Sequence, residues 1–522
     1  MIREISRRKC LRLWLCKPEY MERTKWENRF VLLRFRKKNY MMFLKDLKRF
    51  KMERLYDKLK AYSESDFYAF HMPGHKRNKA LLGIELPYDL DITEIDGFDD
   101  LHHADGILKE EQERAARVFG AEESHFLVNG STAGILSAVM GCTHRGDKIL
   151  VARHCHKSIY HAIYMNGLVP RYVYPEFDIS MHMNGEISKE DVAKALAAEP
   201  DIKAVVIVSP NYDGVVSDVK GIAEVSHSYR IPLIVDEAHG PHFGFHPAFP
   251  GRANDLGADV VINSLHKTLP SLTQTAILHI NGKLVNRRRI KKYLDMLQSS
   301  SPSYIFMASL DACVDFVDGK CENAFELYVE RLQKFREELE PLQHLQILRT
   351  EHYDISKVVI STANANITSP ELADRLRKEY HLEMEMTGGT YVLAMTTVAD
   401  TQEGLDRLKA ALLEIDGQLE AKTAVSGSIE ISGELPRLEQ YFTPQEAAER
   451  EEDGEAEEIP WKESEGHISL EYAYLYPPGS PVIVPGERIS REAVELLCYY
   501  ETQNLQIEGI QTEGKIKVWK HE

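Results

Sequence analysis

Short apolar runs alternate with helix-like segments along most of the chain from residue 67 onward. The two covered faces of a buried parallel strand favour nearly continuous apolar sequence, and β-branched residues dominate these runs. Seven runs are predicted as strands, at 124–129, 148–153, 171–175, 204–209, 232–237, 259–264 and 275–280. We therefore predict an α/β protein with a mainly parallel, seven-stranded sheet sandwiched by helices.

The segments between the runs favour helices. Residues 134–142 and 157–167 have apolar side chains at helical spacing and end near glycine, which commonly stops a helix. A helical zone around 304–342 follows the last strand of the sheet. A second alternation of strand-like runs and helices then covers 357–362, 369–380, 391–396 and 403–415. This pattern predicts a smaller α+β domain.

We place the domain boundaries where the composition changes. The predicted parts are a basic N-terminal segment (1–66), a major domain (67–345), a small α+β domain (346–443) and an acidic linker with a C-terminal segment (444–522). Residues 444–460 are acidic and nearly free of large apolar groups, which indicates a solvated helix or a linker. The stretch 476–487 contains four prolines and two glycines, which predicts a stiff loop.

The composition is that of a globular protein, with 522 residues of which 43% are hydrophobic and 28% charged. No uninterrupted apolar run reaches the length of a membrane-spanning helix. The seven cysteines are scattered without a CxxC pair, so neither a disulfide framework nor a zinc site is predicted. We expect no metal centre, no membrane partner and a cytoplasmic location.

Charge is distributed unevenly along the chain. Residues 1–60 carry 20 Lys and Arg against 7 Asp and Glu, whereas the other 462 residues carry 44 against 74. The acidic body repels nucleic acid and favours cationic partners. The basic start lacks the pattern of a secretory signal. It is interpreted as a peripheral tail, a nucleic-acid arm or, the interpretation we favour, translation upstream of a true start at Met41, Met42 or Met52.

Two candidate catalytic residues lie at or just beyond the ends of neighbouring predicted strands. Asp236 lies near the end of the run at 232–237, and Lys267 comes shortly after the run at 259–264. Ligands of open α/β sheets bind at the carboxyl ends of the strands, so both side chains are expected to face one crevice. An amine and a carboxylate placed there suit pyridoxal phosphate, because lysine forms a Schiff base with its aldehyde and aspartate keeps its pyridine nitrogen protonated.

Both residues also have ordinary structural interpretations. Lys267 alone is typical of a surface lysine, and Asp236 alone of a helix cap or an ion-pair partner. Residues 236–239 read DEAH, which also occurs in helicases, but the GxxxxGK[ST] phosphate loop that those enzymes need is missing from the sequence.

Two further motifs support the same chemistry. Residues 128–134, VNGSTAG, place Ser131 and Thr132 at the predicted start of a helix, where free N–H groups attract a phosphate; an ordinary helix cap is the alternative. His154 and His156 follow another strand. Two histidines without further ligands make a poor zinc pattern, so a ring stacked on a cofactor or a buried histidine is favoured.

Several ordered motifs together give the chain a family resemblance. They are FHMPGHKRN (70–78), DITEIDGFDDLHHADG (91–106), NGSTAG, RHCHKS, SPNYDGVVSD (209–218), VDEAHG, NSLHK, SSSPSY (299–304) and YPPGSP with VPGE. The chain resembles the bacterial ornithine/lysine/arginine decarboxylases, in their short form without an N-terminal wing domain. That family belongs to the fold type I, aspartate aminotransferase superfamily of pyridoxal phosphate enzymes.

The resemblance implies a role for each matching residue. Lys267 would be the Schiff-base lysine, Asp236 would pair with the pyridine nitrogen, and His156 would stack on the ring opposite Ala238. Ser131, Thr132 and Ser264 would hold the phosphate. His266 would transfer or position a proton beside the lysine, and His239 would belong to the cofactor site. Ser300 would reach the phosphate of a neighbouring subunit, which implies a homodimer or larger homo-oligomer with shared active sites.

The implied reaction is decarboxylation of arginine, lysine or ornithine to the corresponding amine and CO₂, as in polyamine-related metabolism. An aminotransferase or aldolase on the same scaffold is the enzymatic alternative, because a fold does not fix a reaction. A catalytically silent regulatory paralogue is the alternative from another class. Which basic amino acid is used does not follow from the residues, although the family favours arginine or lysine slightly.

Overall fold

The computed structural model describes residues 54–520, apart from 82, 179–182, 349–351, 422–434, 476–479 and 504. The predictions for residues 1–53, and for residues 476–479 of the predicted stiff loop, lie outside this part of the chain.

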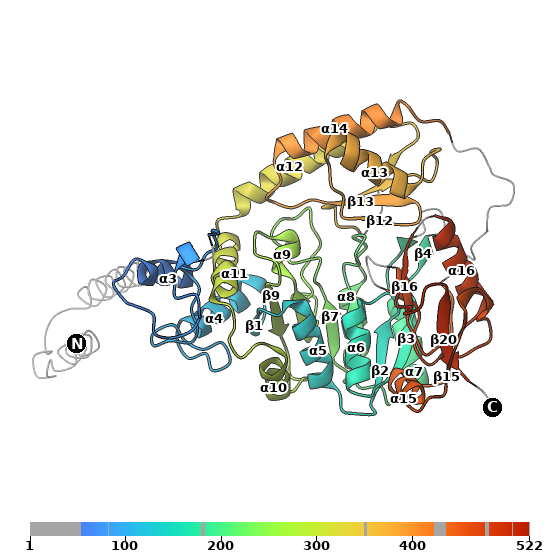
Figure 1. Cartoon of the computed structure of the whole chain (residues 1–522), viewed down its shortest axis with the longest axis horizontal. Coiled ribbons are helices and arrows are strands. Elements are labelled where there is room, and N and C mark those ends of the chain that lie inside the picture. Colours follow the sequence, from blue (N-terminus) through green and yellow to red (C-terminus); the bar gives the residue numbers. More distant parts are fainter. Residues whose placement is uncertain are drawn as a thin grey trace, which may run out of the picture. The chain divides into compact units, whose positions relative to one another are not determined.

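A seven-stranded sheet forms the centre of the largest domain (Figure 1). Its strands are β1 (Glu123–Leu127), β2 (Lys148–Ala152), β3 (Val169–Val173), β6 (Val205–Val208), β7 (Leu233–Asp236), β8 (Val260–Asn263) and β9 (Ala276–Ile280). Their spatial order is β1-β9-β8-β7-β6-β2-β3, and β9 alone runs antiparallel to its two neighbours. All seven predicted strands and the mainly parallel sheet are confirmed.

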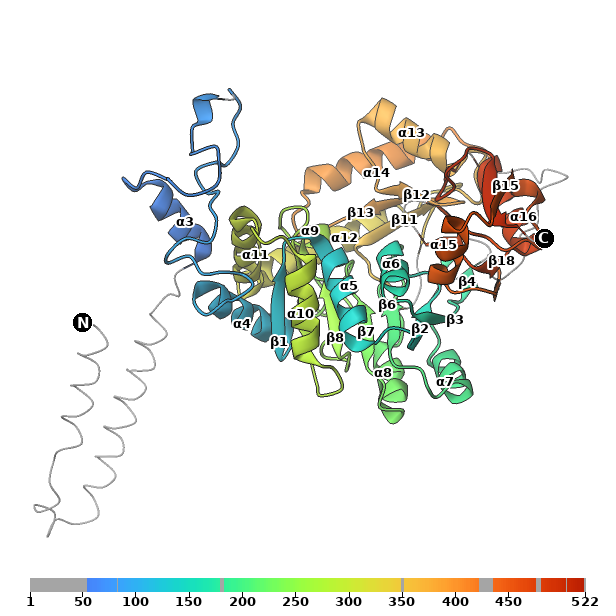
Figure 2. The ribbon, with the colours of Figure 1, turned by 60° about the horizontal axis from the view of Figure 1, so that its bottom comes forward.

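Helices cover both faces of this sheet. Right-handed crossovers place the helices after β1 and β2 on one face and those after β3 and β6 on the other. The contacts between α5 and α6, between α5 and α10, and between α7 and α8 agree with this division, as do the two views (Figures 1 and 2). The elements of this part outside the sheet are η2 (Lys79–Leu81), α4 (Ile107–Phe119), α5 (Gly130–Cys142), α6 (Lys157–Met165), β4 (Phe177–Asp178), β5 (Met183–Asn184), α7 (Lys189–Ala198), α8 (Val219–Ser228), α9 (Leu265–Thr268), α10 (Arg287–Leu297) and α11 (Tyr304–Val317).

A smaller α+β domain follows, as the sequence predicts. Its antiparallel sheet has the order β10-β11-β13-β12, and its helices bury Phe335, Leu376 and Leu412 in a common core. A capping box between Thr368 and Glu371 starts the predicted helix at Ser369. The elements are α12 (Glu322–Glu338), β10 (Gln346–Ile347), β11 (Lys357–Ser361), α13 (Ser369–Tyr380), β12 (Met386–Thr387), β13 (Tyr391–Met395) and α14 (Gln402–Asp416).

The C-terminal part has its own small core around Trp461, Ile483 and Val518. The acidic segment 444–460, predicted to be a solvated helix or a linker, is a helix followed by a strand. The helix buries Pro444 and Ala447, while the strand pairs with the last strand of the chain. The elements are β14 (Glu439–Gln440), α15 (Pro444–Glu452), β15 (Ala456–Pro460), η3 (Trp461–Glu463), β16 (Ala473–Leu475), β17 (Pro481–Ile483), β18 (Glu487–Arg488), α16 (Arg491–Thr502), β19 (Ile507–Glu508) and β20 (Lys515–Trp519).

The last part of the predicted basic N-terminal segment, from residue 54 onward, packs against the large domain. Helix α3 (Leu55–Ser63) buries Leu55 and Leu59 completely and contacts α11. Arg54, just before the helix, forms an ion pair with Asp315. Apolar residues four apart give α3 its buried face, a pattern that the surrounding basic residues obscure in the sequence.

A buried ion pair joins the large sheet to the C-terminal part. The guanidinium of Arg153, which directly follows β2, donates to both carboxylate oxygens of Glu487, at 2.6 and 2.8 Å. The Arg153 side chain is 3% exposed and that of Glu487 is fully buried. Removing one partner leaves an uncompensated charge without access to water.

We expect Glu487→Gln to lower the free energy of unfolding by about 3–5 kcal/mol, because Arg153 then stays buried without a counter-ion. Urea denaturation measures the change. The matched control is Glu439→Gln, which breaks the solvent-exposed Glu439–Arg488 pair. That substitution should change stability by less than about 1 kcal/mol; equally small effects of both would contradict a structural role for the buried pair.

Candidate active site

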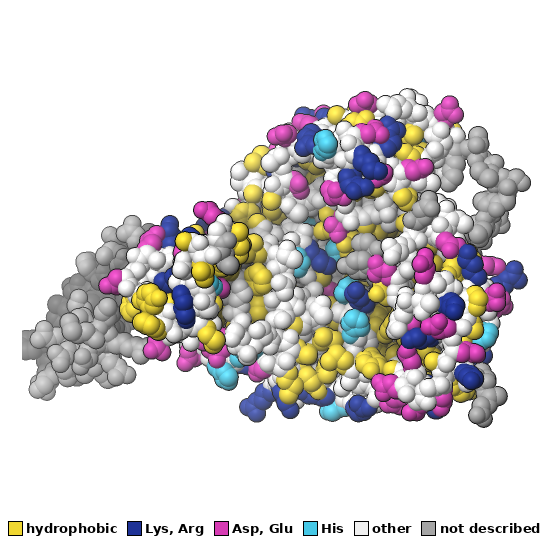
Figure 3. All heavy atoms as spheres, in the orientation of Figure 1, with side chains coloured by type: hydrophobic (Ala, Val, Ile, Leu, Met, Phe, Trp, Pro, Cys, Tyr) yellow, Lys and Arg dark blue, Asp and Glu magenta, His cyan; other side chains and the backbone are white. Residues whose placement is uncertain are grey.

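A cavity of about 350 Å³ lies at the carboxyl ends of the parallel strands. Nine of the ten residues predicted for the site line it, and we call it the Lys267 cavity. Figure 3 shows histidine and basic side chains inside a hollow on this face of the molecule. The predicted residues in its lining are Ser131, Thr132, His156, Asp236, Ala238, His239, Ser264, His266 and Lys267.

Lys267 lies on the single-turn helix α9, which follows β8. Its Nζ is 2.8 Å from His239 Nε2 and 5.8 Å from the centre of the Tyr212 ring. Burial lowers the pKa of Lys267, and the negative charge of Asp236 opposes that shift. A neutral amine is the nucleophilic form of lysine, so this environment favours attack on a carbonyl carbon.

Asp236 is the last residue of β7 and is 3% exposed. Its Oδ1 accepts a hydrogen bond from the backbone N–H of Ala238 at 3.1 Å. Burial raises the pKa of Asp236, and the charge of Lys267 opposes the shift. A cation bound beside Asp236 would compensate this charge, because a buried carboxylate is stable as an anion when it is paired.

Three histidines surround the lysine in different ways. His239, rather than the sequence neighbour His266, makes the direct contact with Lys267. His266 Nδ1 lies 2.9 Å from the carbonyl oxygen of Thr275, which fixes its ring. Burial lowers the pKa of His156 to about 4, with smaller contributions from Lys267 and Lys157, so its ring is neutral at physiological pH.

The start of α5 forms one end of the cavity. Gly130, Ser131 and Thr132 occupy the first turn of this helix. The N–H of Gly130 donates to the carbonyl oxygen of Gln274, and the N–H groups that follow it have no partner within the helix. Gly130 has φ +72°, which favours glycine at the turn between β1 and α5. The hydroxyl oxygen of Ser264 is buried, with no hydrogen-bond partner among the described residues. These donors can hold a phosphate.

Ser300 lies apart from the other predicted residues. It is exposed on the loop between α10 and α11 and does not line the Lys267 cavity. Its neighbour Ser299 donates a backbone hydrogen bond to Asn129 Oδ1, at the start of α5. The loop is therefore tied to the start of α5, and the contact of Ser300 with a second subunit stays a prediction.

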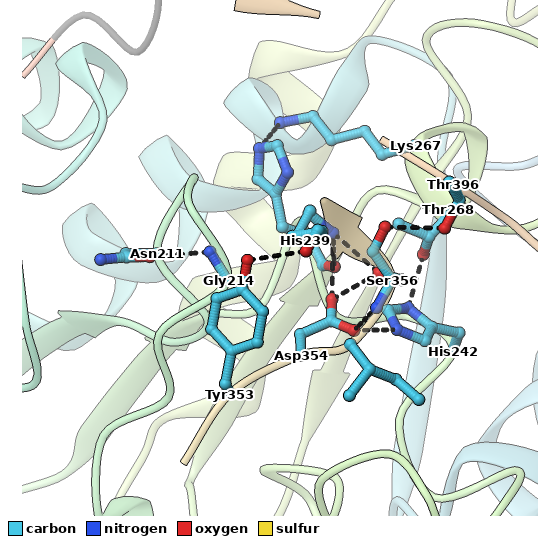
Figure 4. A network of polar contacts seen from close by, with 12 residues as sticks. Asn211, Gly214, His239, His242, Lys267, Thr268, Tyr353, Asp354, Ser356 and Thr396 are labelled. Carbon is cyan, nitrogen blue, oxygen red and sulfur yellow. Dashed lines mark hydrogen bonds and ion pairs between the residues drawn. The ribbon is translucent and has the colours of Figure 1, made fainter. Parts of the chain in front are cut away.

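A buried polar network that includes Lys357 and Asp354 of the small domain lies next to the residues around Lys267 (Figure 4). Lys357, at the start of β11, has no exposed side-chain surface, and its Nζ lies 3.0 Å from Asp354 Oδ2. The other oxygen, Asp354 Oδ1, lies 3.1 Å from His242 Nε2. Lys357 and Asp354 are both fully buried, so removing either side chain would leave the other as an uncompensated buried charge.

The network reaches the cavity by two routes. Lys357 Nζ donates to the carbonyl oxygen of His239 at 3.4 Å, and His242 Nδ1 lies 2.9 Å from the hydroxyl of Thr268. Thr268 directly follows Lys267. The charge of Lys357 also contributes to the lowered pKa values of Lys267 and His239, after burial and other charges.

The sequence motifs did not identify four residues of this arrangement. Tyr212 lies within the motif 209–218, but the sequence predicts no role for it. In the structure its ring centre is 4.4 Å from that of His239. His242, Asp354 and Lys357 belong to no local pattern that differs from ordinary polar sequence. Long-range pairing brings them to the site, and a single sequence carries no signal of it.

Within residues 54–520, as far as they are described, no group of three or more His, Cys, Asp or Glu side chains has metal-binding geometry. The same part of the chain contains no helix of the length and apolarity required to cross a bilayer.

Comparisons with known proteins agree with the motifs. Residues 53–421 match the family "Orn/Lys/Arg decarboxylase, major domain", and residues 433–514 match "Orn/Lys/Arg decarboxylase, C-terminal domain". The arginine decarboxylase of Bacillus subtilis (strain 168) is 33% identical over 471 residues, covering 87% of this chain and 95% of that protein. The arginine decarboxylase of Bacillus anthracis is 32% identical over 487 residues, covering 89% and 97%.

The fold has a close counterpart among solved structures. Lysine decarboxylase A from Pseudomonas aeruginosa superposes with a TM-score of 0.76 at 23% sequence identity, covering 96% of this chain and 84% of that one. At this identity the superposition establishes the α/β fold with its smaller domains.

The raised pKa of Asp236 predicts a stability effect. Because the folded protein holds the Asp236 proton more tightly than the unfolded chain does, ionisation destabilises the fold at neutral pH, and the penalty disappears below the unfolded pKa. We expect Asp236→Asn to raise the melting temperature of the cofactor-free protein by a few degrees at about pH 7.5, and by less toward about pH 4.

The control for this prediction is Asp374→Asn. The hydrogen bonds from Lys378 and Arg377 lower the pKa of this exposed carboxyl, so neutralising it should slightly lower the melting temperature instead. A lower melting temperature for Asp236→Asn at neutral pH would contradict the interpretation of Asp236 as an uncompensated charge.

Proposed function

This chain belongs to the Orn/Lys/Arg decarboxylase family, and from that premise we propose that it removes the α-carboxylate of a basic amino acid, releasing CO₂ and the amine. The observation that carries the proposal is the contact between Lys267 Nζ and His239, next to the buried carboxylate of Asp236, at the carboxyl ends of neighbouring parallel strands. A reactive amine and a buried anion lie within one cavity there.

The residues of the Lys267 cavity fit pyridoxal phosphate. The cavity offers an amine for the cofactor's aldehyde, a buried carboxylate for its pyridinium nitrogen, and an anion-binding helix start with the unpartnered hydroxyl of Ser264 for its phosphate. When bound, the cofactor supplies an electron sink for the bond that breaks at Cα. Lys267, Asp236 and Ser264, with Ser131 and Thr132, would hold it.

The chain's own residues would then orient the cofactor and transfer protons. Asp236 would place a negative charge beside the protonated pyridine nitrogen of the cofactor. This preorganised charge would stabilise the transition state. His156 and Ala238 would contact the two faces of the ring. The neutral His239 ring can accept a hydrogen bond from Lys267 Nζ and orient it, and either Lys267 or His266 would deliver a proton to Cα after CO₂ leaves.

Arginine is the substrate that we favour among the three basic amino acids. The relatives from Bacillus subtilis and Bacillus anthracis, which are 33% and 32% identical to this chain, are named arginine decarboxylases. The acidic body of the chain, with 74 Asp and Glu against 44 Lys and Arg after residue 60, attracts a cationic substrate of any of the three kinds.

A homodimer would cover an exposed apolar segment near the N-terminal end of the described chain. Phe67, Tyr68, Phe70, Met72 and Leu81 each expose between 64% and 90% of their surface. Contiguous apolar side chains of this size mark protein–protein contacts in soluble proteins. The exposed loop of Ser300 would contribute to a second subunit in the same assembly.

The activity is tested by incubating the purified protein with pyridoxal phosphate and arginine, lysine or ornithine, and identifying the amine by mass spectrometry. We expect agmatine from arginine, and a fall of at least about 1,000-fold for Lys267→Ala, because the nucleophile is gone. The exposed Lys283→Ala is the control and should leave the rate unchanged. A keto acid or aldehyde product would instead indicate a transaminase or aldolase, and no product at all a silent paralogue.

The dimer is tested by Phe70→Asp. A carboxylate in the middle of the apolar segment would have to be desolvated in the interface, so we expect dissociation to monomers at micromolar protein concentration. Light scattering after size-exclusion chromatography measures the mass. Leu413→Asp, on an exposed position of α14, should leave the mass unchanged; dimers of Phe70→Asp as tight as wild type would rule out this segment as the interface.

A further inference from the structure

A second cavity, of about 90 Å³, adjoins the Lys267 cavity. The two share His154 and Ser480 in their linings, so they are neighbours. The sheet domain, the small domain and the C-terminal part all contribute to the walls of the second cavity. We call it the Asp213 pocket after the carboxylate residue in its lining.

Asp213 is a buried acid without a cationic partner. The residue is 5% exposed, and its Oδ1 accepts a hydrogen bond from the hydroxyl of Tyr391. No Lys or Arg within the described chain forms an ion pair with it. Burial raises the pKa of Asp213 to about 6, and the Tyr391 hydroxyl opposes the shift. Buried carboxylates in proteins are normally paired, so a missing counter-ion indicates a place for a bound cation.

Arg153, the basic residue of the pocket, is not the counter-ion of Asp213. Arg153 lines the pocket, but its guanidinium is held by both oxygens of the buried Glu487. The pair is therefore neutral as a unit. Asp213 contributes the remaining negative charge of the lining.

Other polar atoms in the lining also lack partners. The side-chain oxygen of Asn184 and the Nδ1 of His154 are both buried, with no hydrogen-bond partner among the described residues. His154 is 6% exposed, and burial lowers its pKa to about 4, so it does not compete as a cation. A ligand with several N–H donors would satisfy these groups, which are otherwise unfavourable to bury.

The turn that carries Asp213 connects the two cavities. Tyr212 lines the Lys267 cavity, while the next residue lines the Asp213 pocket. The Asn211 side chain accepts hydrogen bonds from the N–H groups of Gly214 and Val215, which fixes the turn. Gly214 has φ +105°, and a Cβ there would lie 2.8 Å from the Lys357 side chain, so the turn requires glycine.

We propose that Asp213 binds the distal cation of the substrate, and that the Asp213 pocket is shaped for a guanidinium. This inference rests on the proposed function, because it assigns the far end of a basic amino acid whose α-carbon reacts beside Lys267. A guanidinium suits the pocket because it is planar, weakly hydrated and rich in donors. The walls around the polar groups are apolar or aromatic, including Met386, Leu496 and Tyr500.

The test compares arginine with citrulline, its neutral isostere, in the cofactor-loaded protein. We expect Asp213→Asn to lower kcat/KM for arginine by about 100-fold, because a buried charge-assisted contact is lost. The kcat/KM for citrulline should change less than about threefold, since it brings no charge to the pocket. The visible absorbance of the bound cofactor should stay that of wild type.

A second carboxylate serves as the matched comparison. Glu385 is exposed and accepts a hydrogen bond from the Tyr212 hydroxyl, near the Lys267 cavity. Glu385→Gln should keep the preference for arginine over citrulline. An unchanged preference in Asp213→Asn, or its loss in Glu385→Gln, would overturn the assignment. Tyr391→Phe gives a variant for use if Asp213→Asn does not fold, and it should shift the preference in the same direction by about fivefold.

A binding measurement separates this inference from the proposed function. Agmatine has the guanidinium but no carboxylate, so its affinity is measured by calorimetry without turnover. Wild-type binding that weakens about 100-fold in Asp213→Asn supports the pocket even if no amino acid is decarboxylated. Equal affinity of the two proteins, with agmatine formation by wild type intact, would overturn the pocket and leave the proposed function standing.

Discussion

The fully buried ion pair between Lys357 and Asp354 holds together the parts of the molecule that form the candidate active site. Lys357 starts a strand of the small domain, yet its ammonium contacts the backbone of His239 in the large domain. Asp354 contacts His242, which in turn contacts the residue after Lys267. Charges without access to water leave few alternative arrangements, so the small domain and the two loops have one favourable relative position.

Around this pair, the site combines compensated and uncompensated charge. Lys357 and Arg153 are each buried with a carboxylate, which fixes structure. Asp236 and Asp213 are buried without such a strong partner, and burial raises the pKa of both. A fold that retains two such acids is less stable than it would be with amides in their places. A bound ligand that supplies the missing positive charges would restore this lost stability.

The sequence was sufficient to predict the large sheet because its strands are covered on both faces and therefore read as apolar runs. It was sufficient for Lys267 and Asp236 because they lie at or just after the ends of strands that are neighbours in the chain and in the sheet. The sequence did not predict the antiparallel direction of β9, because that direction depends on the pairing of β9 with β1 and β8. Nor could it predict Lys357, which reaches the site through a contact between residues 118 positions apart in the chain.

The pair of Arg153 and Glu487 has a consequence for the order of events during synthesis. The two residues are 334 positions apart, so the ribosome releases the arginine long before its counter-ion exists. At roughly 5–20 residues per second, that interval lasts about 20–70 s. Throughout it the guanidinium has to remain hydrated, which keeps the end of β2 open to water. The end of β2 can therefore be buried against the C-terminal part only when nearly the whole chain has emerged.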